Sequence, residues 1–251
     1  MNSIKKLAYA ILIYCSITVV CANELQTDLN SLTIITEEYP PISFKNKNGK
    51  ADGLASEVAY TIMKRLKMKQ NIKILPWSRG YSLTKKGPNY LLFSVGRTDI
   101  REKLFQWVGP IYFMKSSFYV KKDSKIKILS LEYAKKIKRI GINREAFDEQ
   151  YLKEQGFKNL KTANNDIAKV KTMMGGRYDV MVNTNVTLSA TMKKAGYTTN
   201  DVKPIYSFME VGVYFAFSKQ VPKQIITAWK DELNKMKDNG ELESIRQKWL
   251  K

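Results

Sequence analysis

The sequence predicts an α/β fold, in which β-strands and amphipathic helices alternate along the chain. Three observations lead to this prediction: short β-rich apolar runs recur between polar turns, helical periodicity follows several of these runs, and no repeat or low-complexity tract interrupts them. Alternation of this kind favours mostly parallel sheets. The 251 residues are enough for one large domain or for two lobes of roughly 100 residues, each with its own core.

The first half of the chain is predicted to contain three strands and two helices. Pro40 and Pro41 end the first strand, because proline cannot donate to a ladder. Leu54, Val58 and Ile62 recur every four residues, which is typical of an amphipathic helix. In order, we expect a strand over 32–36, a helix over 54–66, a strand over 71–75, a loop over 76–79 leading into a short helix, and a buried strand over 90–95.

The second half continues the alternation. Asn164 or Asn165 can cap a helix that ends at Gly175, and Pro222 can begin a late helix that Asn239–Gly240 interrupts. The expected elements are strands over 117–121 and 137–141, helices over 147–155 and 165–174, a strand over 178–182, a helix over 186–194, a strand over 212–217, and two final helices from 222 onward.

The first 22 residues have the three parts of a secretory signal. Met1–Lys6 is basic, Leu7–Val20 is apolar, and Val20–Ala22 fits the small-residue rule for cleavage before Asn23. The apolar run is about 14 residues, which is short for a membrane span. An uncleaved anchor and a lipoprotein acylated at Cys21 are the alternatives. We therefore expect an exported protein that begins at Asn23.

The composition excludes several kinds of chemistry. The chain contains no His, and cleavage would remove both of its cysteines, Cys15 and Cys21. His-dependent triads, disulfides, thiol catalysis and iron–sulfur clusters are thereby excluded from the exported chain, and we expect no metal and no cofactor. Loss of Lys5 and Lys6 lowers the formal charge from +20 to +18. The Lys residues are scattered, which is typical of a solvated surface, and no nucleic-acid-binding motif accompanies them.

Five ordered segments carry a resemblance to a known family. They are Tyr39–Phe44, Gly49–Leu54, Thr98–Arg101, Phe105–Pro110 and Gly176–Val180. Together they make the region from about residue 32 to residue 250 resemble the periplasmic solute-binding proteins of family 3, the amino-acid-binding type. The resemblance implies a two-lobe, type 2 periplasmic-binding fold, in which two crossing strands form a hinge.

The resemblance also implies how the chain is divided. We expect a signal peptide at 1–22, the first part of lobe 1 at 23–112, lobe 2 at 113–210, and a return to lobe 1 at 211–251, with crossings near 112–119 and 207–213. A solute would bind in the cleft between the lobes, which would close around it.

The family's role implies a monomeric periplasmic protein that captures a small solute. Its partner would be an ABC permease or a signalling protein of the inner membrane, and nucleic acid is not expected. Two alternatives stay open. One is an enzyme on the same scaffold, such as a dehydratase that uses cleft carboxylates. The other is an interaction protein that uses its basic surface on anionic lipid or cell wall.

The resemblance gives a set of candidate ligand-binding residues. Arg101 matches the family Arg that pairs with a ligand carboxylate, for which a planar guanidinium is well suited. Tyr39 and Trp77 are expected in loops that face the cleft, and Arg79 would add a second cation. The full set is Tyr39, Trp77, Arg79, Ser94, Thr98, Arg101, Asn143, Arg144, Asn183 and Thr184.

Two positions depart from the family pattern. Glu145–Ala146 replaces a typical Gly-Thr pair before a helix, so that a hydroxyl donor is missing. Thr184 stands where the family usually places the Asp that binds a ligand ammonium. These departures favour an anionic or neutral solute over a cationic amine. The remaining acids, including Glu37, Glu38 and Glu57, are interpreted as surface or structural residues.

Overall fold

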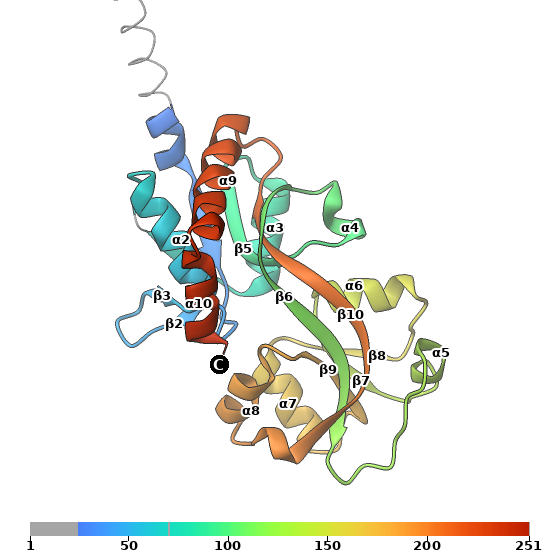
Figure 1. The fold of residues 1–251 in the computed structure, drawn as a ribbon. Helices are drawn as coiled ribbons and strands as arrows, with labels where there is room; N and C mark the ends of the chain where they lie inside the picture. The colour runs from blue at the N-terminus through green and yellow to red at the C-terminus, as the bar shows by residue number, and fades with distance from the viewer. Residues whose placement is uncertain (1–24, 70, 251) are drawn as a thin grey trace, which may run out of the picture.

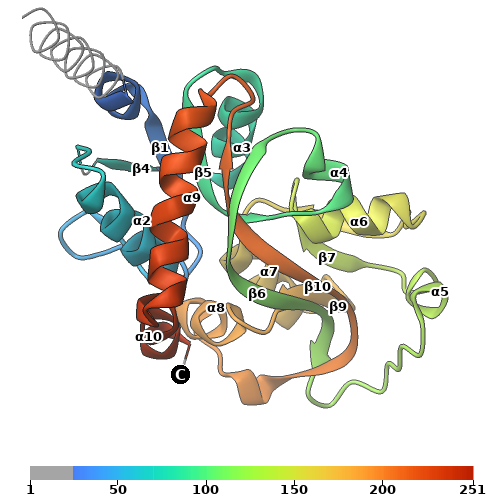
Figure 2. The same cartoon turned by 45° about the horizontal axis from the view of Figure 1, so that its top comes forward.

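The computed structural model describes residues 25–69 and 71–250. The chain has two α/β lobes linked by two long strands, and Figures 1 and 2 show this arrangement from two directions. The predicted α/β class is confirmed. The predicted signal sequence at residues 1–22 lies outside the described residues.

In the described part of the chain, eight strands form one sheet in the order β4-β1-β5-β10-β6-β9-β7-β8. Lobe 1 contains the parallel pairs β1–β4 and β1–β5, and lobe 2 contains the parallel pairs β7–β8 and β7–β9. The strands are β1 (Thr33–Thr36), β4 (Ile72–Ile74), β5 (Tyr90–Gly96), β6 (Gln106–Lys121), β7 (Ile140–Asn143), β8 (Leu160–Ala163), β9 (Val180–Thr184) and β10 (Val202–Phe217), and a separate hairpin contains β2 (Phe44–Lys45) and β3 (Ala51–Asp52).

Helices cover the sheet in both lobes (Figure 1). In lobe 1, α2, α9 and α10 pack together on one face, and α3 packs on β1 and β5 from the other. In lobe 2, α7 and α8 pack together. The helices are α2 (Leu54–Arg65), α3 (Trp77–Lys86), α4 (Asp99–Glu102), α5 (Leu131–Ala134), α6 (Phe147–Glu154), α7 (Asp166–Met174), α8 (Leu188–Ala195), α9 (Lys223–Asp238) and α10 (Glu241–Trp249).

Two antiparallel strands, β6 and β10, run through both lobes (Figure 2). Each has 16 residues, so the predicted strands at 117–121 and 212–217 are only parts of them. They pair antiparallel with β5 and β9 as well, and the sheet is therefore parallel within each lobe and antiparallel at its centre. The lobe boundaries after residues 112 and 210 stay a prediction.

The two lobes have separate apolar cores. In lobe 1, Trp229 of α9 is fully buried, with its ring centroid 5.1 Å from that of Phe215 and 5.7 Å from that of Phe217 in β10. In lobe 2, Phe118 of β6 packs with Val180 and Val182 of β9 in a different cluster. The C-terminal helices therefore complete the lobe that the N-terminal strand begins.

Several local predictions are confirmed and others are wrong. Asn165 caps α7, its Oδ1 accepting from the Ala168 N–H at 2.9 Å, and Pro222 precedes α9 as expected. Trp77 and Arg79 lie in the first turn of α3 and not in a loop, because helical hydrogen bonds begin at the Pro76 carbonyl. The predicted strand at 137–141 begins only at Ile140. The sequence did not predict β8, α4 or α5.

Candidate functional site

The two lobes touch directly along an interface formed by their facing loops and helix ends. The Tyr39 hydroxyl of lobe 1 lies 3.2 Å from Thr184 Oγ1 of lobe 2. Trp77 Nε1 donates to the Glu145 carbonyl at 2.9 Å. Phe147 of α6 joins the apolar cluster of lobe 1, where its ring lies against Gly96. These contacts place the predicted site residues Tyr39, Trp77 and Thr184 at one interface, with the lobes in a closed arrangement.

Arg101 lies at the centre of this interface. Its side chain is fully buried, and its guanidinium bonds to both lobes. In lobe 2 it donates to Gln150 Oε1 at 2.8 Å and to the Glu145 carbonyl at 2.9 Å; in lobe 1 it donates to the Gly96 carbonyl at 3.3 Å. Burial lowers the pKa of Arg101 from its usual value, and the nearby Tyr81, Asp148 and Glu37 oppose this effect.

Two aromatic rings flank the Arg101 guanidinium. Its central carbon lies 5.2 Å from the centroid of Trp77 and 4.9 Å from that of Tyr81. The rings themselves stack with centroids 5.3 Å apart, because Trp77 and Tyr81 are one helical turn apart in α3. Aromatic faces attract the cation and fix the plane of the guanidinium. The two rings thus fix the orientation of the Arg101 side chain.

β5, the strand that leads toward Arg101, has an unusual backbone near its end. Ser94 has a φ of 68°, a region that non-glycine residues seldom occupy, and it is almost fully buried. Its Oγ lies 3.4 Å from Ser43 Oγ, which in turn lies 3.1 Å from the Glu37 carbonyl. Thr98 occupies the N-cap of α4, but its side chain makes no capping bond. The strained Ser94 and the loop carrying Glu37 and Tyr39 therefore support each other.

Gly53 explains how the loop that carries Tyr39 is held. Its φ is 107°, and a Cβ at this position would lie 2.7 Å from the carbonyl oxygens of both Pro41 and Ile42. Those two carbonyls accept the first N–H groups of α2, from Leu54 and Ala55. A glycine is needed there because any side chain would push the loop away from the helix.

Tyr39 meets a small polar network on lobe 2. Thr184 Oγ1 lies 2.9 Å from Thr187 Oγ1, and Asn183 Oδ1 accepts from Thr187 Oγ1 at 3.1 Å. Burial raises the pKa of Tyr39, which keeps its hydroxyl protonated. Asn183 and Thr184, both predicted site residues, therefore lie at the interface as a neutral hydrogen-bonding surface.

A cluster of carboxyl groups lies beside Arg101, and sequence analysis did not identify it. Burial raises the pKa of Glu37 to about 8; the charge of Asp166 adds to this effect and that of Arg101 opposes it. Burial likewise raises the pKa of Asp148, with Lys169 opposing and Asp166 adding. Lys169 Nζ lies 2.6 Å from Asp166 Oδ1. The three carboxyl groups of Glu37, Asp148 and Asp166 thus lie near the two cations Arg101 and Lys169.

Closure of the lobes is expected to weaken as the pH rises. Glu37 has an ordinary pKa near 4.5 when it faces water and one of about 8 in the closed arrangement, so closure takes up a proton between these values. The closed form is favoured below about pH 4.5 and loses up to about tenfold in relative population per pH unit until about pH 8. Asp166, Asp148 and Arg101 are the charged groups that act on this carboxyl directly or through the cluster.

Trp77 offers a readout of this pH dependence, because its indole donates across the interface. Its fluorescence, with Trp77→Phe as the background, should change between about pH 5 and pH 8. Glu37→Gln, which cannot ionise, should make that profile flatter. A profile that is unchanged in Glu37→Gln would contradict the role given to this carboxyl.

The backbone N–H groups of the loop before α6 donate to acceptors within lobe 2. The Glu145 N–H donates to Glu149 Oε2 at 2.5 Å, and the Arg144 N–H donates to the Ala163 carbonyl at 3.1 Å. Asn143 Nδ2 donates to Asp166 Oδ1 at 2.8 Å. The backbone groups that were expected to receive a carboxylate are therefore partly occupied by internal acceptors, whereas Asn143 lies in the acidic cluster.

Two predicted site residues do not join the others. Arg79 is exposed on α3, and Arg144 is exposed in its loop. Neither side chain makes a hydrogen bond or an ion pair with the described residues. The structure does not bring Arg79 or Arg144 into the interface, because both side chains are exposed to solvent.

Several residues at the interface were missed. Tyr81 and Gln150 contact Arg101, and Asp148, Asp166 and Lys169 form the acidic cluster with Glu37. A partial signal existed for Asp166, since it follows the predicted cap Asn165 at the start of a helix. Gln150 had none, because its position in α6 depends on how the lobes meet.

Four buried polar atoms near the interface have no hydrogen-bond partner among the described residues. They are the Tyr112 hydroxyl, Asn143 Oδ1, Asn183 Nδ2 and Thr98 Oγ1. A buried polar group without a partner is unfavourable by about 1 to 3 kcal/mol, so such groups are rare.

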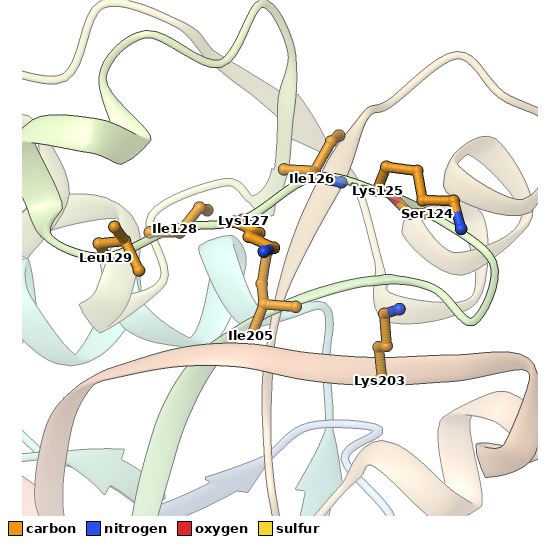
Figure 3. A pocket seen from close by; sticks show the side chains of 8 residues that line it. All are labelled: Ser124, Lys125, Ile126, Lys127, Ile128, Leu129, Lys203 and Ile205. Atoms are coloured by element: carbon orange, nitrogen blue, oxygen red, sulfur yellow. Dashed lines mark hydrogen bonds between the residues drawn. The ribbon is translucent and has the colours of Figure 1, made fainter.

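A second feature lies at the outer edge of lobe 2, away from Arg101. A groove of about 400 Å³ runs between the segment after β6 and the edge of β10. Figure 3 shows the side chains that line it: Ser124, Lys125, Ile126, Lys127, Ile128, Leu129, Lys203 and Ile205. Lysine side chains beside an exposed edge strand of this kind protect the sheet from pairing with another chain.

The described residues contain no group of three or more His, Cys, Asp or Glu side chains placed to hold a metal ion. Over the same residues, every helix is too short or too polar to cross a bilayer.

Comparison with known proteins identifies a family and several relatives that this chain resembles. A sequence model of the bacterial extracellular solute-binding proteins, family 3, matches residues 32–251. The octopine-binding periplasmic protein of Rhizobium meliloti is 28% identical over 236 residues, which cover 80% of this chain and 77% of that protein. The arginine-binding periplasmic protein of Mannheimia haemolytica is 23% identical over 227 residues, with 87% and 90% covered.

A solved histidine kinase sensor domain with similarity to periplasmic binding proteins has the same fold. It superposes with a TM-score of 0.79 at 20% identity, covering 88% of this chain and 97% of that one. At this identity the likeness concerns the fold alone, and it confirms the predicted two-lobe, type 2 architecture.

Proposed function

Because this chain belongs to the bacterial extracellular solute-binding proteins, family 3, we propose that it captures a small carboxylate-bearing solute, an amino acid or a related organic acid, between its lobes. The observation that carries this proposal is the placement of Arg101. A fully buried guanidinium stands at the interface, held flat by two aromatic rings and bonded to both lobes.

Arg101 retains capacity for a ligand. A guanidinium carries five N–H groups, and the three bonds to Gln150, Gly96 and Glu145 use one on each nitrogen. Two N–H groups, one on each terminal nitrogen, are not used by these bonds. A carboxylate accepts from such a pair in parallel, which fixes its direction as well as its charge. Trp77 and Tyr39 supply aromatic surface for the remainder of the solute.

The connection between the lobes supports opening and closing. β6 and β10 are the long strands that pass from one lobe to the other, and their pairing register shifts at three places, including one between Ser207 and Met209. Bending at irregular positions of two strands lets two rigid lobes rotate about a hinge. A solute that contacts both lobes would favour closure and would be shielded from water.

The cellular role follows from the family and the predicted secretory signal. The protein would act as a monomer in the periplasm and deliver its solute to an ABC permease, or report it to a signalling protein in the inner membrane. The octopine- and arginine-binding periplasmic relatives support solute capture, and the fold shared with a histidine kinase sensor domain is compatible with a sensor. We expect binding without turnover.

Thermal melting against a solute panel tests this function. The chain from Asn23 to Lys251 would be melted with amino acids, dicarboxylates, keto acids, aromatic acids, short peptides and sugars. A ligand at about 100 times its dissociation constant stabilises by about 2.7 kcal/mol, which raises the midpoint by roughly 5 to 10 °C. The stabilising solute should contain a carboxylate and should be recovered unchanged by NMR. A shift caused only by uncharged sugars would contradict the proposal.

A further inference from the structure

The strand β10 has a free edge in lobe 2. Residues 202–211 pair with β6 on one side, whereas pairing with β5 on the other side begins only at Val213. No other described strand pairs with this part of β10. The backbone N–H and C=O groups on its free side can therefore pair with an added strand, which is how exposed sheet edges bind extended peptides.

A second segment with strand-like exposure borders the same groove (Figure 3). Exposure alternates along residues 125–129, where Ile126 and Ile128 are turned inward and the residues on either side of each are exposed, as along a strand. Among the described residues, the backbone of this segment makes one hydrogen bond, from the Ile126 N–H to Ser124 Oγ at 3.2 Å. Unpaired backbone groups thus lie on both sides of the groove.

The lining of the groove is basic. Lys125, Lys127 and Lys203 line it, no acidic side chain does, and none of the three ammonium groups forms an ion pair with a described residue. The nearest acids in the sequence do not neutralise them, because Asp201 caps the turn before β10 and Asp123 does not line the groove. Lysines two positions apart on a strand are about 6.6 to 6.8 Å apart, which is also the spacing of alternate side chains on a facing strand.

One end of the groove is apolar (Figure 3). Leu129 lines this end and is 74% exposed, the largest exposed fraction among the large apolar side chains of the described residues. Ile205 of β10 lies nearby and is half-buried. The groove therefore combines unpaired backbone groups, two regularly spaced cations and an uncovered apolar side chain.

We propose that this groove binds an extended acidic peptide of a partner protein. The peptide lies along the free edge of β10, with alternate carboxylates against Lys125 and Lys127 and an apolar side chain over Leu129. Main-chain hydrogen bonds supply affinity in this mode of binding, and alternate side chains supply specificity. The proposal does not rest on solute capture, because none of the residues that line the groove contacts Arg101.

The lysines select among possible occupants. They disfavour neutral and basic strands at this edge, whereas an acidic strand neutralises them. A second copy of the chain is disfavoured, since the formal charge is +20 and self-pairing at this edge would oppose lysine to lysine. An anionic membrane surface would contact the lysines but would leave the backbone groups of the edge unpaired. An acidic peptide uses all three features of the groove.

Fluorescence anisotropy with labelled synthetic peptides tests the proposal on the chain from Asn23 to Lys251. The probe is a blocked peptide of about nine residues in which Glu alternates with Thr, made with Leu at either end so that both strand directions are sampled. One control peptide has the same residues with the Glu grouped together. Two others carry N-methyl groups on alternate backbone nitrogens, each removing the N–H donors from one edge of the peptide and keeping its charge.

One of the alternating peptides should bind about tenfold or more tightly than the grouped control, and methylation of one edge should remove that advantage. The double variant Lys125→Glu/Lys127→Glu should weaken its binding by about tenfold or more. Lys223→Glu/Lys230→Glu is the matched control, because it makes the same change in charge at two exposed positions of α9 in lobe 1; its effect should stay within about threefold. Bound peptide should also slow hydrogen exchange in residues 125–129 and 202–206.

Four results would overturn the proposal. The first is no binding of either alternating peptide up to about 1 mM. The second is equal binding of the alternating, grouped and methylated peptides, which indicates attraction by charge alone. The third is equal weakening by the two double variants. The fourth is binding to phosphatidylglycerol vesicles that needs Lys125 and Lys127 in the absence of peptide binding, which would assign the groove to anionic lipid. Solute capture at Arg101 is tested separately by the thermal panel.

Discussion

Arg101→Ala is expected to weaken solute binding by about 2 to 5 kcal/mol, the range for truncating one partner of a buried charge pair. This corresponds to a loss of affinity of about 30- to 5,000-fold. The effect is large because the guanidinium is fully buried, because it is the cation positioned for the solute carboxylate, and because it ties Gln150 and the Glu145 carbonyl to lobe 1. Titration calorimetry with the panel's best solute measures it.

Two further variants distinguish recognition from general damage. Arg101→Lys keeps the charge but loses the planar pair of donors, so it should restore only part of the affinity. Arg97→Ala is the matched control, since Arg97 pairs with Glu102 at 2.6 Å outside the lobe interface. Its affinity should stay within about twofold of the unmodified protein. Equal affinity of Arg101→Ala and the unmodified protein would reject the role of Arg101.

Trp229→Ala is expected to destabilise the protein by about 3 to 5 kcal/mol, the usual range for removing a large aromatic side chain from a core. Trp229 is fully buried between Phe215 and Phe217, so its loss leaves a cavity at the junction of α9 and β10. Denaturant unfolding followed by circular dichroism measures the free energy of unfolding.

Trp229→Phe serves as the control for this core position. The Trp229 Nε1 is buried without a hydrogen-bond partner in the described part of the chain, so its replacement loses packing but no hydrogen bond. Its effect should be clearly smaller than that of Trp229→Ala. A destabilisation below about 1 kcal/mol for Trp229→Ala would contradict the packing of α9 in lobe 1.

Local sequence patterns predicted the elements that short-range periodicity or capping determines. The four-residue periodicity of Leu54, Val58 and Ile62 places α2 correctly, and Asn165 caps α7 through its own side chain. The lengths of β6 and β10 were not predictable in this way. β6 contains Gly109–Pro110 and β10 contains Pro204, and propensity rules place such residues outside strands. Pairing between two segments about 100 residues apart overrides that local preference.

The site residues that belong to recognisable motifs were predictable from the sequence. Those whose environment depends on contact between the two lobes were not. Arg101 and Tyr39 belong to recognisable segments, and both lie at the interface. Glu37 was interpreted as a surface or structural acid, because its environment depends on Asp166, 129 positions along the chain. Trp77 was placed in a loop, although its position at the start of α3 is what stacks it on Tyr81.

The most direct test of solute capture at Arg101 is a crystal structure of the chain from Asn23 to Lys251 with the most stabilising panel solute. We expect the solute between the lobes, with its carboxylate oxygens about 2.7 to 2.9 Å from the Arg101 guanidinium nitrogens. A solute bound elsewhere, for example in the lysine-lined groove of lobe 2, or one whose carboxylate faces away from Arg101, would contradict the account.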